Sequence, residues 1–254
     1  MNDLLNANDL IKAGERIDDL ECNGFCIIQN PSYFCFGMDA VLLSGFVNAG
    51  KKSKTIDLGT GTGIIPLLLT AKDKVSDVTG LEIQAEVADM ASRSVELNKA
   101  SDRCHIVQGD IKEIRQLYEH QSFDIVTSNP PYISDSKGLM NPNTSVNIAR
   151  HEVLVSLEEV ISAAAYLLKN GGSFNMVHKP FRIPEIMQLM MKYKLEPKRM
   201  QLVQPYCDKE PNMVLIESIK AANPGCRILP SLIIYNKDGT YTREVLSIYG
   251  KIGE

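Results

Sequence analysis

Asp124-Ile125-Val126-Thr127-Ser128-Asn129-Pro130-Pro131-Tyr132 runs from an apolar segment directly into an amide, two prolines and an aromatic ring. The β-branched and aromatic residues from Phe123 to Val126 predict a buried β-strand. Two consecutive prolines fix two φ angles and remove two backbone donors, so the strand cannot continue past Asn129. Open α/β sheets hold their ligands at the carboxyl ends of strands, and a rigid turn at that place predicts a binding site. A proline-rich loop with a surface tyrosine is the alternative for this stretch taken alone.

A second strand, Lys54 to Leu58, leads into a glycine-rich turn and a helix through Leu69, with Pro66 in the first helical turn. The turn, Asp57-Leu58-Gly59-Thr60-Gly61-Thr62-Gly63, lets a ligand approach the backbone closely. A dinucleotide fingerprint requires a third glycine at position 64, where this chain has isoleucine. Asp57 would also repel a pyrophosphate. Its carboxylate suits an ammonium group, such as that of the methionyl end of S-adenosylmethionine.

Two further strands are expected to end in acids. The strand Asp77 to Glu82 ends about 20 residues past the glycines, where a carboxylate can bind both hydroxyls of a ribose. The strand Cys104 to Gln108 is followed by Asp110, which can accept from an adenine amino group, and by Ile111, which can cover the ring. Each acid alone would be an ordinary residue at a strand end, but four consecutive strands with polar ends predict one ligand site.

The other expected elements complete an α/β pattern. Asp39 is expected to cap a helix from Ala40 to Val47. The capping box Ser156-Leu157-Glu158-Glu159 opens a helix to Lys169 that Gly171-Gly172 ends. The remaining elements are a loop over 133–152, a strand over 173–178, a helix in the basic segment 179–199, strands over 200–204 and 213–219, and a hairpin turn at Asn236-Lys237-Asp238-Gly239.

Composition and charge exclude several classes of protein. The chain has 254 residues, 44% hydrophobic and 23% charged, as in soluble globular proteins. Its longest apolar run, Ile64 to Leu69, is too short to span a bilayer, and we see no secretion signal. The six cysteines lack metal-ligand spacing, so we expect reduced thiols, no metal and a cytoplasmic location.

The net charge of −4 argues against wrapping of duplex DNA. The segment Lys179 to Arg199 nevertheless has six cations against two acids, and it is either a phosphate-binding face or a solvated helix face.

The order of Asp57 with its glycine turn, Glu82, Asp110 and Asn129-Pro130-Pro131-Tyr132 resembles the class I S-adenosylmethionine-dependent methyltransferases, in their amino-methylating branch. Over nearly its full length the chain resembles the bacterial tRNA(Val) adenine-N6 methyltransferases, which modify the adenosine beside the anticodon. The segments that carry this closer resemblance are Phe36-Gly37-Met38-Asp39-Ala40, Ala149-Arg150-His151-Glu152, His178-Lys179-Pro180-Phe181-Arg182, Glu196-Pro197-Lys198-Arg199 and Glu210-Pro211-Asn212.

This resemblance implies a Rossmann-like α/β fold with a seven-stranded, mostly parallel sheet, helices on both faces and a small C-terminal β-hairpin. We expect an N-terminal extension over the cofactor site (1–48), a methyltransferase domain (49–220) and a C-terminal extension packed on that domain (221–254). The implied cofactor contacts are Phe36, Gly37, Asp39, Asp57, Gly59, Thr60, Gly61, Gly63, Glu82, Ile83, Asp110, Ile111 and Asn129.

The resemblance also implies methyl transfer to an adenine amino group. That nitrogen is a poor nucleophile, and its two hydrogens can donate to the Asn129 side chain and the Pro130 carbonyl, which frees the lone pair. Tyr132 would stack on the extruded base. The expected substrate contacts are Pro131, Tyr132, Arg150, His151, Lys179, Arg182, Lys198 and Arg199.

The expected partner is a tRNA anticodon stem-loop, bound by a monomer or weak homodimer, with no membrane or metal involved. The same turn would serve a glutamine amide, so a release-factor glutamine methyltransferase is the close alternative. Only about 50 residues precede the cofactor strand, which disfavours that class because it usually carries a helical N-terminal domain. A protein that binds RNA or cofactor without catalysis is the alternative from a different class.

Overall fold

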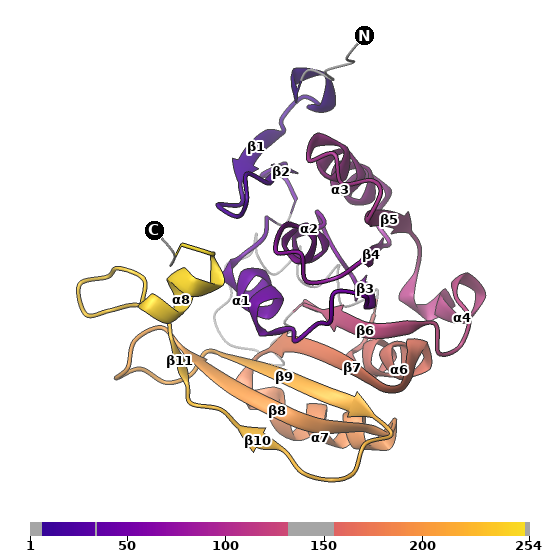
Figure 1. Ribbon diagram of the computed structural model, residues 1–254, viewed down its shortest axis with the longest axis vertical. Coiled ribbons are helices and arrows are strands. Elements are labelled where there is room, and N and C mark those ends of the chain that lie inside the picture. The colour runs from indigo at the N-terminus through magenta and orange to yellow at the C-terminus, as the bar shows by residue number, and fades with distance from the viewer. Residues whose placement is uncertain (1–6, 34, 132–154, 252–254) are drawn as a thin grey trace.

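The computed structural model describes residues 7–33, 35–131 and 155–251. Its centre is one mixed sheet with the strand order β10-β8-β9-β7-β6-β3-β4-β5, and β11 pairs with β8 (Figure 1). Five neighbouring strands are parallel: β3 (Lys54–Leu58), β4 (Asp77–Glu82), β5 (Cys104–Gln108), β6 (Phe123–Ser128) and β7 (Leu168–His178). Strand β9 (Met213–Lys220) runs antiparallel to both β7 and β8 (Leu195–Gln204).

These seven strands confirm the predicted mostly parallel α/β sheet. Two-residue strands β10 (Arg227–Ile228) and β11 (Leu232–Ile233) extend it beyond seven by pairing with β8. A separate hairpin of β1 (Arg16–Asp19) and β2 (Cys26–Gln29) follows the short 3₁₀ helix η1 (Ala7–Leu10).

Helices cover both faces of the sheet (Figure 1). One core cluster is built around α1 (Met38–Phe46) and α2 (Ile64–Ala71) and also takes side chains from the N-terminal hairpin and the C-terminal tail. A second lies under α6 (Leu157–Leu167), α7 (Ile183–Lys192) and α4 (Ile114–Leu117). Helix α3 (Ala85–Leu97) buries Val87, Met90 and Ala91 and contacts β2.

Two predicted boundaries in the second half of the chain were wrong. Helix α6 opens with the predicted capping box at Ser156 but ends at Leu167, and β7 begins at Leu168 and runs through Gly171-Gly172. A Cβ on Gly172 would come within 2.8 Å of the Asp124 carbonyl oxygen, so this glycine serves a close approach between β6 and β7. Glycine is not a helix terminator here.

The basic segment 179–199 is helical only over its middle. The 3₁₀ turn η3 (Pro180–Arg182) leads into α7, and β8 already begins at Leu195, because Leu195 pairs with Lys220 of β9. Lys198 and Arg199 therefore lie on a strand, where a register shift between Pro197 and Arg199 accommodates the proline.

Both ends of the chain add elements of their own. The predicted cap of the first helix was displaced, since the N-cap of α1 is Gly37 and Asp39 lies within the first turn. In the tail, the turn at Asn236–Gly239 brings Tyr235 and Tyr241 into an antiparallel bridge, and the chain continues into α8 (Arg243–Ile248), which the sequence analysis did not predict.

Candidate active site

The polar residues at the carboxyl ends of β3, β4, β5 and β6 meet at one edge of the sheet. These four strands are parallel neighbours in the order β6-β3-β4-β5, so their carboxyl ends all face the same way. Asp57, Glu82, Asp110 and Asn129 are consequently brought together, as the sequence predicted for a single ligand site.

Asp57 is a buried carboxylate at this edge of the sheet. Its side chain is fully buried, and Oδ1 accepts a hydrogen bond of 2.6 Å from the Thr127 hydroxyl on β6. Oδ2 makes no hydrogen bond of normal geometry within the described part of the chain. Burial raises the pKa of Asp57 to about 6, although the hydroxyls of Thr127 and Thr60 act in the opposite direction and the Glu82 charge adds to the rise. A buried carboxylate of this kind is suited to a cationic ligand group.

The glycine turn leaves open space beside Asp57. Gly59 and Gly61 have φ angles of 71° and 57°, in the left-handed region that favours glycine, and a Cβ on either would meet no atom within 4 Å. The backbone amides of Gly59 and Thr60 both donate to the Leu81 carbonyl, which fixes the turn on β4. Helix α2 begins directly after Gly63, so the turn presents both a free approach to the backbone and a helix start.

Glu82 is held in place by backbone donors. Its Oε2 accepts from the Gly61 amide at 2.9 Å, and its Oε1 accepts from the Gln84 amide at 3.0 Å. Oε1 also accepts from the Gln84 side-chain amide at 3.1 Å. Of the about four acceptor positions of a carboxylate, one on Oε2 therefore remains for a ligand hydroxyl. Ile83 follows at the turn and is half-buried.

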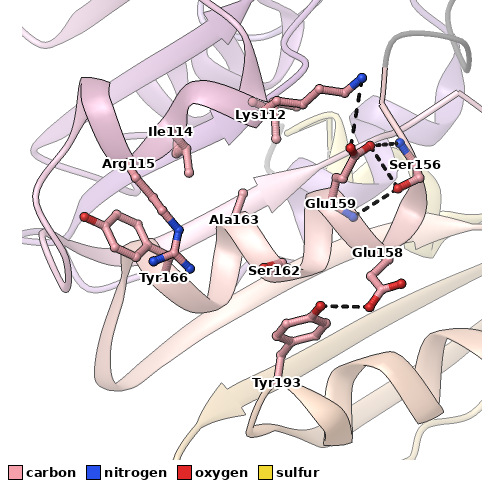
Figure 2. A pocket seen from close by; sticks show the side chains of 11 residues that line it. Lys112, Ile114, Arg115, Ser156, Glu158, Glu159, Ser162, Ala163, Tyr166 and Tyr193 are labelled. Atoms are coloured by element: carbon pink, nitrogen blue, oxygen red, sulfur yellow. Dashed lines mark hydrogen bonds and ion pairs between the residues drawn. The ribbon is translucent and has the colours of Figure 1, made fainter.

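Asp110 and Ile111 lie where β5 leads into the 3₁₀ turn η2 (Ile111–Glu113). Asp110 is its N-cap, accepting from the Lys112 amide at 2.9 Å, and Ile111 is buried in the core under α6. Beyond Ile111 a cavity of about 420 Å³ opens between η2, α4 and α6, and Figure 2 shows Arg115 against the Tyr166 ring and Lys112 reaching toward Glu159. Only Ile111 is shared with the expected cofactor contacts, so this cavity is a neighbour of the predicted cofactor site.

The Phe36-Gly37-Met38-Asp39 segment is tied to the N-terminal hairpin. The Phe36 amide donates to the Gln29 side-chain oxygen at 3.0 Å, and Asp39 accepts from the Ala40 amide. A Cβ on Gly37 would lie 2.9 Å from Asp39 Oδ1, so a larger residue here would displace this carboxylate.

The turn after β6 is anchored at its base. The Ser128 hydroxyl donates to the Leu58 carbonyl at 2.8 Å, which ties the end of β6 to the end of β3, and Asn129 follows directly, half-buried. Pro130 is buried and Pro131 half-buried. Tyr132, Arg150, His151 and the 133–152 loop, all named in the sequence analysis, lie outside the described residues.

Within the described residues, the four cationic side chains that were predicted to contact the substrate fall into two pairs. Lys179 and Arg182 follow β7 at the carboxyl edge, and the Arg182 guanidinium binds Glu185 at 2.6 and 2.8 Å. Lys198 and Arg199 lie within β8: Lys198 Nζ donates to the Asn223 carbonyl, and Arg199 pairs with Glu217 at 2.6 Å and donates to the Phe46 carbonyl. This second pair thus has structural contacts to the tail and to the end of α1.

Two residues of this edge were absent from the predicted site. Thr127 holds Asp57, and its signal is a hydroxyl directly after the buried apolar pair Ile125-Val126. His178 ends β7 beside the Asn129 turn, is only 1% exposed, and accepts from the Lys179 amide at Nδ1. A lone histidine next to a lysine carries no sequence signal of burial.

A family model and several known sequences are similar to this chain. The family model for the methyltransferase small domain matches residues 36–196. A relative from Porphyromonas gingivalis, named tRNA1(Val) (adenine(37)-N6)-methyltransferase, is 31% identical over 232 residues, covering 88% of this chain and 90% of its own. A relative of the same name from Parabacteroides distasonis is 30% identical and covers 71% of this chain and 75% of its own.

Solved structures share the fold. A predicted O-methyltransferase, Atu636 from Agrobacterium tumefaciens, superposes with a TM-score of 0.69 at 22% identity, covering 84% of this chain and 96% of that one. TYW2 from Pyrococcus horikoshii superposes with a TM-score of 0.57 at 14% identity, covering 83% and 73%. No helix within the described residues is long and apolar enough to cross a membrane. The chain belongs to the methyltransferase small domain family, alongside relatives named tRNA1(Val) (adenine(37)-N6)-methyltransferases.

Proposed function

We propose that this protein transfers a methyl group from S-adenosylmethionine to the N6 amino group of an adenosine in tRNA, beside the anticodon of tRNA(Val). The observation that carries the proposal is the position of Asn129, which leaves β6 one residue after Ser128 is bonded to the end of β3. An amide acceptor is thereby held at the same sheet edge as the buried Asp57 carboxylate. The names of relatives about 30% identical support the same activity.

The residues at this edge fit the cofactor. Asp57 offers a buried carboxylate oxygen to an ammonium group, and the open face of Gly59 and Gly61 admits the methionyl part against the backbone. Glu82, held by the Gly61 and Gln84 backbone amides and the Gln84 side chain, lies at the same edge and keeps an acceptor position on Oε2 for a ribose hydroxyl. Asp110 and Ile111 follow the next strand, where the adenine would lie. S-adenosylmethionine supplies an electrophilic methyl group on its sulfonium.

The Asn129 turn acts on the target amino group. The Asn129 side-chain oxygen and the Pro130 carbonyl accept its two hydrogens, which turns the nitrogen lone pair away from conjugation with the ring. Neither Pro130 nor Pro131 has an N–H that competes for these acceptors. The methylated ammonium is acidic, so a neutral amide suffices and the proton leaves to solvent. The Tyr132 ring is proposed to stack on the extruded target base.

The RNA side of the site follows β7. Lys179 and Arg182 follow β7 at the carboxyl edge, and we propose that they contact phosphates. Lys198 and Arg199 instead hold the tail and α1, so they are left out of the proposed contact surface. Arg150 and His151 remain proposed substrate contacts. We further propose that the enzyme works in the cytoplasm as a monomer or weak homodimer and without a metal ion.

The test is transfer of a labelled methyl group to separated tRNA, ribosomal RNA, DNA and protein fractions, followed by nucleoside analysis. The proposal expects N6-methyladenosine in tRNA, and loss of label with Asn129→Ala but not with Asn170→Ala. Asn170 is an exposed asparagine near the start of β7, at the opposite edge of the sheet. Label on a protein glutamine alone would overturn the substrate and favour a release-factor methyltransferase.

A further inference from the structure

Phe181 has an exposed phenyl ring that belongs to none of the core clusters. Its side chain is 64% exposed, whereas the next most exposed aromatic ring within the described residues, Tyr33, is 39% exposed. Single exposed apolar residues are common on protein surfaces, so exposure alone assigns no role. Its place in the fold and the rigidity of its backbone make this ring different.

Phe181 lies just past the end of β7, the strand next to the one that leads into the Asn129 turn. Strands β6 and β7 are parallel neighbours, and Ser128 pairs with Met176, so His178 is level with Pro130 when the register is continued by two residues. Adjacent strands are about 4.8 Å apart. Phe181 follows His178 by three residues, which limits their Cα separation to at most about 11 Å. The Cα of Phe181 therefore lies at most about 16 Å from the Cα of Pro130 in the Asn129 turn.

The backbone that carries Phe181 is fixed from both sides. His178 is buried, and burial together with the Arg182 charge lowers its pKa to about 4, so the imidazole is neutral at pH 7 and its Nδ1 accepts from the Lys179 amide at 2.7 Å. Pro180 occupies the first position of η3, and the Arg182 amide donates to the Lys179 carbonyl. The Arg182 guanidinium then binds Glu185 in α7 through two nitrogens. Because the backbone of Phe181 is already ordered, contact of its ring with a partner costs only side-chain conformational entropy.

We infer that Phe181 is a stacking platform for a nucleobase adjacent to the target adenosine in the RNA substrate. This inference rests on the proposed function. An unpaired loop base has an apolar face that needs a partner when its neighbour is extruded, and aromatic rings supply one with little regard to sequence. The flanking cations Lys179 and Arg182 suit the phosphates on either side of such a base. Phe181 is thus a positioning residue, which sets the approach of the RNA and takes no part in methyl transfer itself.

The first test measures binding of a tRNA anticodon stem-loop oligonucleotide by fluorescence anisotropy in the presence of S-adenosylhomocysteine. Phe181→Ala should weaken binding about 5- to 150-fold, the range for loss of one base–aromatic stack, and Phe181→Tyr should restore it. The slope of affinity against salt should stay unchanged because no charge is removed. The matched control is Met191→Ala, since Met191 is also 64% exposed but lies at the other end of α7, near the start of β8 at the amino edge.

The second test replaces the nucleotides on either side of the target adenosine, one at a time, by abasic residues. If Phe181 stacks on one of them, that abasic oligonucleotide should bind the wild type and Phe181→Ala with equal affinity, so the two changes are non-additive. Additive losses at both neighbours, or unchanged binding by Phe181→Ala, would overturn the inference while leaving methylation of RNA by the wild type intact. Failure of the wild type to methylate or bind any RNA would instead refute the proposed function.

Discussion

Replacing Asp57 with asparagine should change the pH dependence of stability and abolish cofactor binding in the same protein. Burial holds the pKa of this carboxyl at about 6 in the folded chain, against an ordinary value of 3.8 in the unfolded chain. As the pH rises, the Asp57 carboxyl therefore loses its proton at a higher pH in the folded chain than in the unfolded chain. The stability that the proton confers is fully present below about pH 4, falls as the pH rises, and is lost above about pH 6.

The size of the effect follows from the shift in pKa. A difference of about two units corresponds to about 3 kcal/mol at 1.36 kcal/mol per unit, with Asp57 fully buried. The asparagine side chain of the variant cannot ionise, and its oxygen can still accept from the Thr127 hydroxyl. The stability of Asp57→Asn minus that of the wild type should thus rise by about 2 to 3 kcal/mol between pH 4 and pH 8. Any fixed cost of the new amide hydrogens cancels in this comparison.

The assay is urea unfolding of the cofactor-free proteins across this pH range, paired with calorimetric titration of S-adenosylhomocysteine. Wild-type affinity should increase as pH rises through about 6, because the ammonium group needs the ionised carboxylate, and the variant should show no binding. Asp124→Asn, at the other end of β6 and paired with Lys169, is the control that should leave cofactor affinity unchanged. Parallel stability curves for wild type and Asp57→Asn, or normal cofactor affinity in the variant, would refute the role assigned to Asp57.

Three further expectations concern separate parts of the molecule. Asn129→Ala should lower kcat by about two to three orders of magnitude with cofactor affinity nearly unchanged, and an equal loss of cofactor affinity would show a structural role. Lys179→Glu should weaken RNA binding and reduce its salt dependence, whereas unchanged binding would remove this lysine from the RNA surface. Ser156→Ala removes the N-cap bond to the Glu159 amide and should destabilise the protein by about 1 kcal/mol in urea unfolding, and no change would show that α6 does not depend on its capping box.

The sequence predicted the sheet and the ligand edge because both depend on local patterns. Each of the four strands carries a polar site residue at or within two residues of its carboxyl end, and parallel strands must bring these ends together. The glycine turn was also predictable from the sequence, because Gly59 and Gly61 adopt left-handed backbone conformations that other residues rarely take.

Contacts between segments that are distant in the sequence could not be predicted from local patterns. Gly172 looks like a helix terminator in the sequence, and only the approach of the Asp124 carbonyl explains a glycine within β7. Arg199 contributes one positive charge to the count of its segment, whereas in the fold it faces Glu217 across β8 and β9. The burial of His178 and the exposure of Phe181 likewise depend on how β7 ends beside β6, which composition does not reveal.

The most direct measurement of the central claim is methylation of a tRNA(Val) transcript by the purified protein with labelled S-adenosylmethionine, compared with a transcript in which guanosine replaces the adenosine beside the anticodon. The account predicts one N6-methyladenosine at that position in the first transcript and no label in the second. Equal labelling of both transcripts, or of neither, would contradict the assignment of this adenosine as the substrate.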